Sequence, residues 1–150
     1  MKSAWNDADA AAFANDPIAL RAYSSRLLGG DPSLVLHGGG NTSVKVRTAD
    51  FFGTPEDVLC VKGSGWDLAT IAPAGFAPVR MDVLLKLAAM PVLSDADMVR
   101  VQKGATTRAG APAPSVEAIL HALIPFAFVD HTHADAVVAL SNTPGGAQTL

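Results

Sequence analysis

Apolar positions recur along the chain in two kinds of run, and the two kinds alternate. Helical runs repeat an apolar residue every three or four positions, whereas strand-like runs are short and rich in β-formers. The clearest helix is expected to begin at Asp16 and Pro17, an N-cap residue followed by proline at the first helical position, and to end at Gly29-Gly30. A looser helix or a partly ordered arm is expected over Ala8–Ala14.

The other expected elements follow from the same patterns. Helices are predicted over Met81–Met90, Asp95–Lys103 behind the N-cap Ser94, Val116–Leu123 behind Ser115, and Ala134–Leu140. Strands are predicted over Leu34–His37, Ser43–Arg47, Val58–Lys62 and Phe126–His133. After the last Pro-Gly-Gly loop, no further element is expected before Leu150. Because strands alternate with helices, the pattern predicts an α/β or layered α+β fold, a sheet covered by helices.

Composition narrows the class of protein. With 150 residues the chain has the length of one domain, which we divide into an N-terminal arm over 1–15 and a domain over 16–150. A hydrophobic content of 49% excludes a disordered chain. No apolar run approaches the ~20 residues of a membrane-spanning helix, and polar residues interrupt the N-terminus where a secretion signal needs an apolar segment. The single cysteine, Cys60, forms no internal disulfide, so we expect a cytoplasmic protein.

The net charge of −3 argues against a nucleic-acid binder, and its distribution is informative. Residues 109–150 contain no lysine or arginine, but they hold three acids, Glu117, Asp130 and Asp135, and three of the four histidines. An acidic segment with histidines suits a bound cation better than an anion. The alternative is that a short apolar segment simply carries few charges.

The strongest candidate for a metal site is His131-Thr132-His133. On a strand, residues i and i+2 share a face with Cα atoms about 6–7 Å apart, so that two imidazoles can converge on one ion such as zinc. The alternative is one packed and one exposed histidine.

Glu117 is expected near this pair. It lies in the first turn of the helix predicted just before the histidine strand, where it could be a metal ligand, a proton-transfer base or only a helix-stabilising acid. His121, four residues later, can share its helix face, either near the metal or as an ordinary helix histidine.

Two glycine loops and a helix start indicate an anion site. The loops Gly38–Ser43 and Gly63–Gly65 each lie at a strand end, where free backbone N–H groups form an anion nest, and Ser115 begins a helix. The sequence has no Gly-x-Ser-x-Gly elbow, no complete dinucleotide fingerprint and no Walker motif. A phosphate or sugar phosphate is therefore the expected ligand, with tight turns that bind nothing as the alternative.

Four short motifs, in this order, resemble the signature of the class II aldolases, the zinc-dependent fuculose- and rhamnulose-phosphate aldolases, whose relatives include the adducin head. The motifs are Gly40-Asn41-Thr42-Ser43, Lys62-Gly63-Ser64-Gly65, Pro114-Ser115-Val116-Glu117 and His131-Thr132-His133. The segment Pro114–Pro144 is most similar to the aldolase half of bifunctional proteins in which a short-chain dehydrogenase domain follows a rhamnulose-1-phosphate aldolase domain. The resemblance extends over about 20–144 and implies a layered α/β/α fold with a mainly antiparallel sheet.

The resemblance also implies a role for each motif. Five residues would bind the substrate phosphate: Gly40, Asn41, Ser64, Gly65 and Ser115. Glu117 would be the catalytic acid or base, His131 and His133 would ligate one zinc ion, and Glu117 could itself bind that zinc at rest. The implied reaction cleaves a ketose 1-phosphate, such as rhamnulose 1-phosphate, to dihydroxyacetone phosphate and an aldehyde (lactaldehyde). NAD would enter only with a downstream dehydrogenase domain.

Two departures from the family pattern matter. Val116 replaces a second serine, which removes one phosphate contact, and no histidine follows His133, so that the third zinc histidine would lie beyond residue 150. We therefore expect a domain truncated at its C-terminal end, and a homo-oligomer, a tetramer by resemblance, for the full-length protein.

Two other functions stay open. A sugar-phosphate epimerase or dehydratase could use the same zinc site. A non-catalytic, adducin-like interaction module is the other alternative, against which the retained His131, His133 and Glu117 argue.

Overall fold

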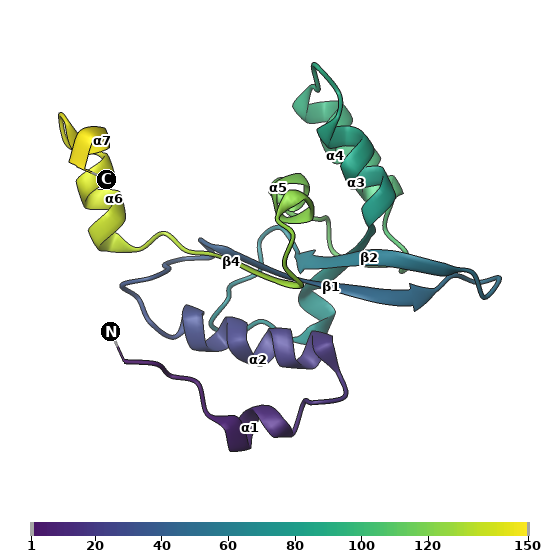
Figure 1. The fold of residues 1–150 in the computed structure, drawn as a ribbon, viewed down its shortest axis with the longest axis horizontal. Helices are drawn as coiled ribbons and strands as arrows, with labels where there is room; N and C mark the ends of the chain where they lie inside the picture. The colour runs from purple at the N-terminus through teal and green to yellow at the C-terminus, as the bar shows by residue number, and fades with distance from the viewer. Residues whose placement is uncertain (1, 150) are drawn as a thin grey trace.

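A four-stranded antiparallel sheet forms the centre of the computed structural model, which describes residues 2–149 (Figure 1). The strands are β1 (Asn41–Ala49), β2 (Pro55–Lys62), β3 (Phe76–Arg80) and β4 (Phe128–His131), in the spatial order β3-β2-β1-β4. The helices are α1 (Asp7–Ala11), α2 (Pro17–Gly29), the short 3-10 turn η1 (Pro73–Gly75), α3 (Met81–Ala88), α4 (Asp95–Gly104), α5 (Ala118–Leu123), α6 (Asp135–Ser141) and α7 (Gly146–Thr149).

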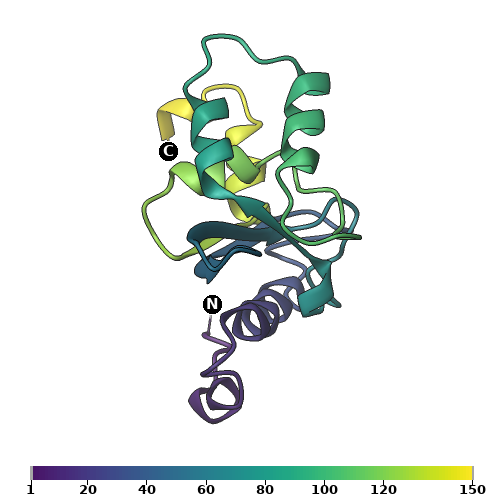
Figure 2. The same ribbon diagram turned by 90° about the vertical axis from the view of Figure 1, so that its right-hand side faces the viewer.

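Different helices cover the two faces of the sheet, as Figure 2 shows with α2 on one side and α3 and α4 on the other. Side chains alternate between the faces along each strand. The core beneath α2 contains Ala22, Val44, Val58, Cys60, Ile71 and Phe76. The core beneath α3 and α5 contains Leu59, Val61, Ala77, Val79, Leu84, Ala105, Ala118 and Ala122. The layered α/β/α fold with an antiparallel sheet is confirmed.

Helix α2 begins and ends where the sequence predicts. The Asp16 carboxylate accepts hydrogen bonds from the backbone N–H groups of Ile18 and Ala19, as an N-cap does. At the other end, the helix packs closely on the segment after β2, because a Cβ on Gly29 would lie 2.2 Å from the backbone nitrogen of Ala69.

Gly29→Ala is therefore expected to destabilise the protein by about 3 kcal/mol, since backbone must move to admit the methyl group. Gly104→Ala, at the end of α4, is the matched control, because no atom lies within 4 Å of its added Cβ. That substitution should be neutral or stabilising by about 0.4–1 kcal/mol. Urea unfolding of both variants measures the difference, and equal stabilities would contradict the close packing at Gly29.

The strand predicted over Leu34–His37 is wrong. The segment forms turns, because Asp31 caps it with a side-chain hydrogen bond to the backbone N–H of Ser33 and a backbone bond from Leu34. His37 then adopts a left-handed φ of 49°. Instead of joining the sheet, the segment accepts a backbone hydrogen bond at Leu34 from the N–H of His133, and so supports the chain after β4.

Other boundaries also differ from prediction. β3 was not predicted because Pro78 interrupts it; as an edge strand it tolerates the missing N–H. Helix α5 begins at Ala118 rather than Val116, so Glu117 is its N-cap residue and not part of its first turn. β4 covers only the middle of the strand predicted over Phe126–His133.

A short helix, α7, does follow the Pro-Gly-Gly loop, contrary to expectation. The predicted helices near Met81, Ser94 and Ala134 are present as α3, α4 and α6, with shifts of a few residues at their ends. α6 and α7 extend from the end of β4 away from α3 and α4 (Figure 1). Among the described residues, every helix is too short or too polar to cross a bilayer.

Candidate active site

The sequence motifs meet in one cavity of about 230 Å³. Its lining comes from the loop before β1, the end of β2, the segment before α5 and the segment after β4. The lining residues are Gly38, Gly39, Gly40, Lys62, Ser64, Gly65, Ser115, Val116, Glu117 and His133. Four of the five residues predicted to bind phosphate are among them. The fifth, Asn41, is buried and contacts Glu117 instead.

Glycine is required in the loop before β1. Gly38 and Gly40 have φ of 77° and 66°, a left-handed region that other residues rarely adopt. A Cβ on Gly39 would also lie 3.2 Å from Nδ1 of His133, and one on Gly40 would lie 2.5 Å from a methyl group of Val35. The loop therefore passes close to His133. Because its residues are glycines, its backbone rather than side chains lines the cavity.

One carboxylate oxygen of Glu117 accepts a hydrogen bond, and the other lies close to an imidazole. Nδ2 of Asn41 donates to its Oε2 at 2.7 Å, and Nδ1 of His131 lies 3.0 Å from its Oε1. Burial raises the pKa of Glu117, but the hydrogen bond from Asn41 and the neighbouring His131 outweigh it, so the pKa lies below its usual value. Glu117 is therefore a carboxylate at neutral pH.

Three side chains gather as potential metal ligands. One ligand atom each from Glu117, His121 and His131 lies within 4.8 Å of the others. Nδ1 of His131 and Nε2 of His121 are buried and have no hydrogen-bond partner among the described residues, and the close contact of His131 with Glu117 lacks hydrogen-bond geometry. Unpaired imidazole nitrogens beside an ionised carboxylate fit a divalent cation.

His133 reaches the site without the strand that was expected to place it. β4 ends at His131, yet the two imidazole rings lie side by side, with centroids 4.8 Å apart. The turn that bonds to the backbone of His133 does what a longer strand was expected to do. His133 lines the cavity, whereas His121, which sequence reasoning left open between two roles, belongs to the ligand cluster.

Lys62 is a site residue that the sequence analysis did not single out, although it begins one of the motifs. Its side chain is 94% buried, with 6% exposed, and its Nζ donates to the backbone oxygen of Gly38 at 2.9 Å. Burial lowers the pKa of Lys62, while Glu117 and Asp67 raise it. Among the described residues that line this cavity, Lys62 is the one lysine or arginine.

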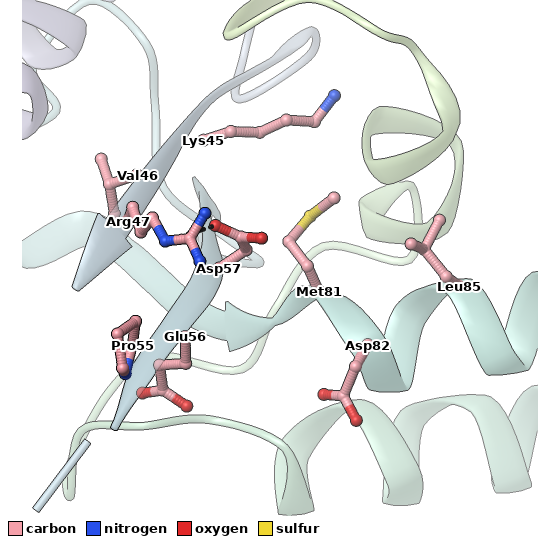
Figure 3. A pocket seen from close by; sticks show the side chains of 9 residues that line it. All are labelled: Lys45, Val46, Arg47, Pro55, Glu56, Asp57, Met81, Asp82 and Leu85. Carbon is pink, nitrogen blue, oxygen red and sulfur yellow. Dashed lines mark ion pairs between the residues drawn. The ribbon is translucent and has the colours of Figure 1, made fainter. Parts of the chain in front are cut away.

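A larger hollow lies elsewhere on the molecule. It has about 680 Å³ and is lined by β1, β2 and the start of α3 (Figure 3). Its charged groups partly face one another, with Nε of Arg47 3.9 Å from a carboxylate oxygen of Asp57. None of the motif residues lines it, so its size does not identify it as the site.

The comparison with protein families decides the classification. Residues 20–149 match the model of the Class II Aldolase and Adducin N-terminal domain. The chain belongs to this family. The predicted resemblance is therefore confirmed.

A solved class II aldolase domain has the same fold. The chain is 43% identical to the N-terminal class II aldolase domain of a conserved protein from Thermoplasma acidophilum, with a TM-score of 0.86 over 95% of this chain and 65% of that one. It is also 36% identical over 148 residues to an uncharacterized oxidoreductase, YuxG, of Bacillus subtilis (strain 168). The match covers 99% of this chain but only 21% of that relative.

We expect the stability of this class II aldolase domain to depend on pH through His121. Its ring is 1% exposed and its Nδ1 lies 2.8 Å from Oγ of Ser43. Burial lowers the pKa of His121 to about 4, although Glu117 opposes the shift. The imidazole is therefore neutral at pH 7.

In the metal-free protein, lowering the pH from 7 to 5 is expected to remove about 2 kcal/mol of stability through His121. The unfolded chain takes up this proton near pH 6.5, whereas the folded chain does so only near pH 4. Urea unfolding at both pH values measures the loss, and His121→Gln should remove this part of it. A pH dependence equal in both proteins would contradict the assignment.

Proposed function

We propose that the chain is the N-terminal part of a metal-dependent aldolase domain. Its substrate would be a ketose 1-phosphate such as rhamnulose 1-phosphate, and its products would be dihydroxyacetone phosphate and lactaldehyde. The observation that carries the proposal is the cavity in which Gly40, Ser64 and Ser115 meet Glu117 and His133. An anion nest directly beside a carboxylate and imidazoles suits a substrate with a phosphate at one end and a reacting carbon nearby.

The phosphate would bind at the glycine loops. Gly40 and Gly65, both with positive φ, and the hydroxyl groups of Ser64 and Ser115 offer donors around one space, and Lys62 adds a positive charge. Val116 contributes no hydroxyl there. Binding energy from this remote phosphate would position the reacting carbons against Glu117.

The metal would be held by His131, His133 and Glu117. Of these, His131 and Glu117 lie in the ligand cluster with His121, and the ring of His133 lies beside that of His131. Zinc fits these ligands, and when bound it would act as a Lewis acid that stabilises negative charge on the substrate oxygens. These three residues are the metal ligands that we propose from this chain.

Glu117 would move the proton. In the cleavage direction, the carboxylate would take up the proton that the C4 hydroxyl group loses as the C3–C4 bond of the substrate breaks, and would then give this proton to C3 of the enediolate that remains. In the synthetic direction, the carboxylate would remove a proton from the same carbon of dihydroxyacetone phosphate. Asn41 holds one oxygen of Glu117 and favours the charged form, which prepares the carboxylate for that removal.

The longer relative suggests the wider context. It is named an oxidoreductase, and this chain matches only 21% of it. We propose that the full-length protein joins the aldolase domain to a short-chain dehydrogenase domain that uses NAD. A cytoplasmic homo-oligomer, with a small sugar phosphate as its ligand, remains part of this proposal.

An assay of the full-length protein with rhamnulose 1-phosphate tests the function. Release of dihydroxyacetone phosphate, followed with glycerol-3-phosphate dehydrogenase and NADH, is the expected result. A product that keeps all its carbons would indicate an epimerase or dehydratase instead. If a panel of ketose 1-phosphates gave no turnover with zinc present, the adducin-like module would replace the proposal.

A further inference from the structure

A charged pair lies on the face of the sheet opposite the candidate site. Arg21 of α2 has 1% of its side chain exposed, and its Nη2 lies 2.7 Å from Oδ1 of Asp130 on β4. Asp130 is the carboxylate that pairs with Arg21 among the residues described. Neither residue touches the site cavity, and the proposed reaction uses neither of them.

Arg21 also begins a buried hydrogen-bonded chain to β1. Its Nε donates to Oγ of Ser25 at 3.2 Å, and this Oγ lies 2.7 Å from Oγ1 of Thr42 and 2.6 Å from the backbone oxygen of Arg21. The single hydroxyl hydrogen of Ser25 goes to that backbone oxygen, so the hydroxyl of Thr42 donates to Ser25. Every contact in the chain is then satisfied, as buried polar groups require.

Both connections end at one cross-strand pair. Thr42 of β1 and Asp130 of β4 are directly opposite each other in the antiparallel register. The adjacent pair is Asn41 and His131, whose side chains point to the other face and contact Glu117. Helix α2 therefore bonds to both strands at Thr42 and Asp130. These residues are the direct neighbours of Asn41 and His131, whose side chains touch Glu117.

β4 depends on these bonds more than an inner strand would. In the part of the chain that the structure describes, β4 pairs only with β1, through four residue pairs from Asn41–His131 to Val44–Phe128. At its edge it has no second strand among the described residues. The guanidinium of Arg21 also lies 5.5 Å from the centre of the Phe128 ring, so one buried side chain contacts β4 at two positions.

We propose that Arg21 and Asp130 are positioning residues for the candidate site, because their ion pair fixes β4 against β1 and thereby places His131 beside Glu117. The inference deepens the proposed function, in which His131 is a metal ligand. It predicts that the pair controls the position of an imidazole that neither residue touches.

The first test uses the metal-free protein and the imidazole NMR signals of His131. Asp130→Asn and Arg21→Met are expected to move these signals, while Arg21→Lys, which keeps the charge, should restore them in part. The double variant Arg21→Met with Asp130→Asn should shift the signals no further than either single change, because the pair acts as a unit. Ile71→Val is the control, since Ile71 is fully buried in the core between α2 and the sheet and its apolar side chain takes no part in the hydrogen bonds and the ion pair of Arg21.

The second test titrates the same variants with Co²⁺ and follows its visible absorption spectrum. Asp130→Asn is expected to weaken Co²⁺ binding about tenfold, the lower end of the effect of residues that orient metal ligands, and to change the spectrum. Asp130→Asn keeps the shape of the side chain, so the test remains possible if Arg21→Met does not fold.

The outcomes separate the two proposals. If the variants lose stability as the control does but leave the His131 signals and the spectrum unchanged, the pair is only structural and the inference is overturned. If the unaltered protein binds no Co²⁺, the proposed metal function fails. The NMR comparison then still decides whether the pair positions His131.

Discussion

Glu117→Gln is expected to lower kcat by about 10²–10⁴-fold, the usual range for loss of a general acid or base. Glutamine has nearly the same shape, and its side-chain oxygen can still accept the hydrogen bond from Asn41. It cannot give or take the proton, so the loss should appear in kcat far more than in KM. Steady-state kinetics of dihydroxyacetone phosphate release in the full-length protein measures both constants.

Glu56→Gln provides a matched control for this substitution. Glu56 is the other glutamate of the chain and lies on β2, outside the site cavity. Its change should leave kcat within a factor of two. If Glu117→Gln also kept kcat within that factor, Glu117 would not carry the proton, and another group would have to be sought.

Removal of the metal is expected to abolish more than about 99% of the activity, since Lewis-acid stabilisation contributes several kcal/mol to such transition states. Chelation followed by dialysis should produce this loss, and added Zn²⁺ should reverse it. His131→Asn should reproduce the loss in a way that Zn²⁺ does not reverse, because His131 lies in the ligand cluster.

His37→Asn is the control for the loss of a histidine. His37 is exposed, does not line the cavity and has a left-handed φ of 49° that asparagine also tolerates. It should keep both activity and response to Zn²⁺. Full activity in protein shown to be free of metal would refute the metal-dependent mechanism.

The residues of the candidate site could be predicted better than the local structure that positions them. Residue types and their order placed Gly40, Ser64, Ser115 and Glu117 together, and the cavity contains all four. The argument from strand geometry did not hold for His133, because β4 ends before it. Its place beside His131 depends on a backbone bond from a distant turn, which no local pattern reveals.

Sequence patterns also gave no sign of contacts between distant segments. Lys62 lies on β2 and its ammonium group bonds to a loop 24 positions earlier, so the run of residues around it gives no sign of the contact. Leu34–His37 has the apolar content of a strand, but Asp31 offers the backbone a competing set of turn hydrogen bonds. Local propensity cannot decide between such alternatives when tertiary partners determine which one forms.

The long range of the site contacts has a consequence for biosynthesis. Asn41 meets Glu117 across 76 positions, and Ser43 meets His121 across 78. Contacts between such distant positions form late, because the intervening chain must first be ordered. While the ribosome is still making the segment that becomes β4, the growing chain holds the glycine loop but no imidazole from His131 or His133. A metal at the proposed site could therefore bind only after the chain has been synthesised through His133 and β4 has joined the sheet.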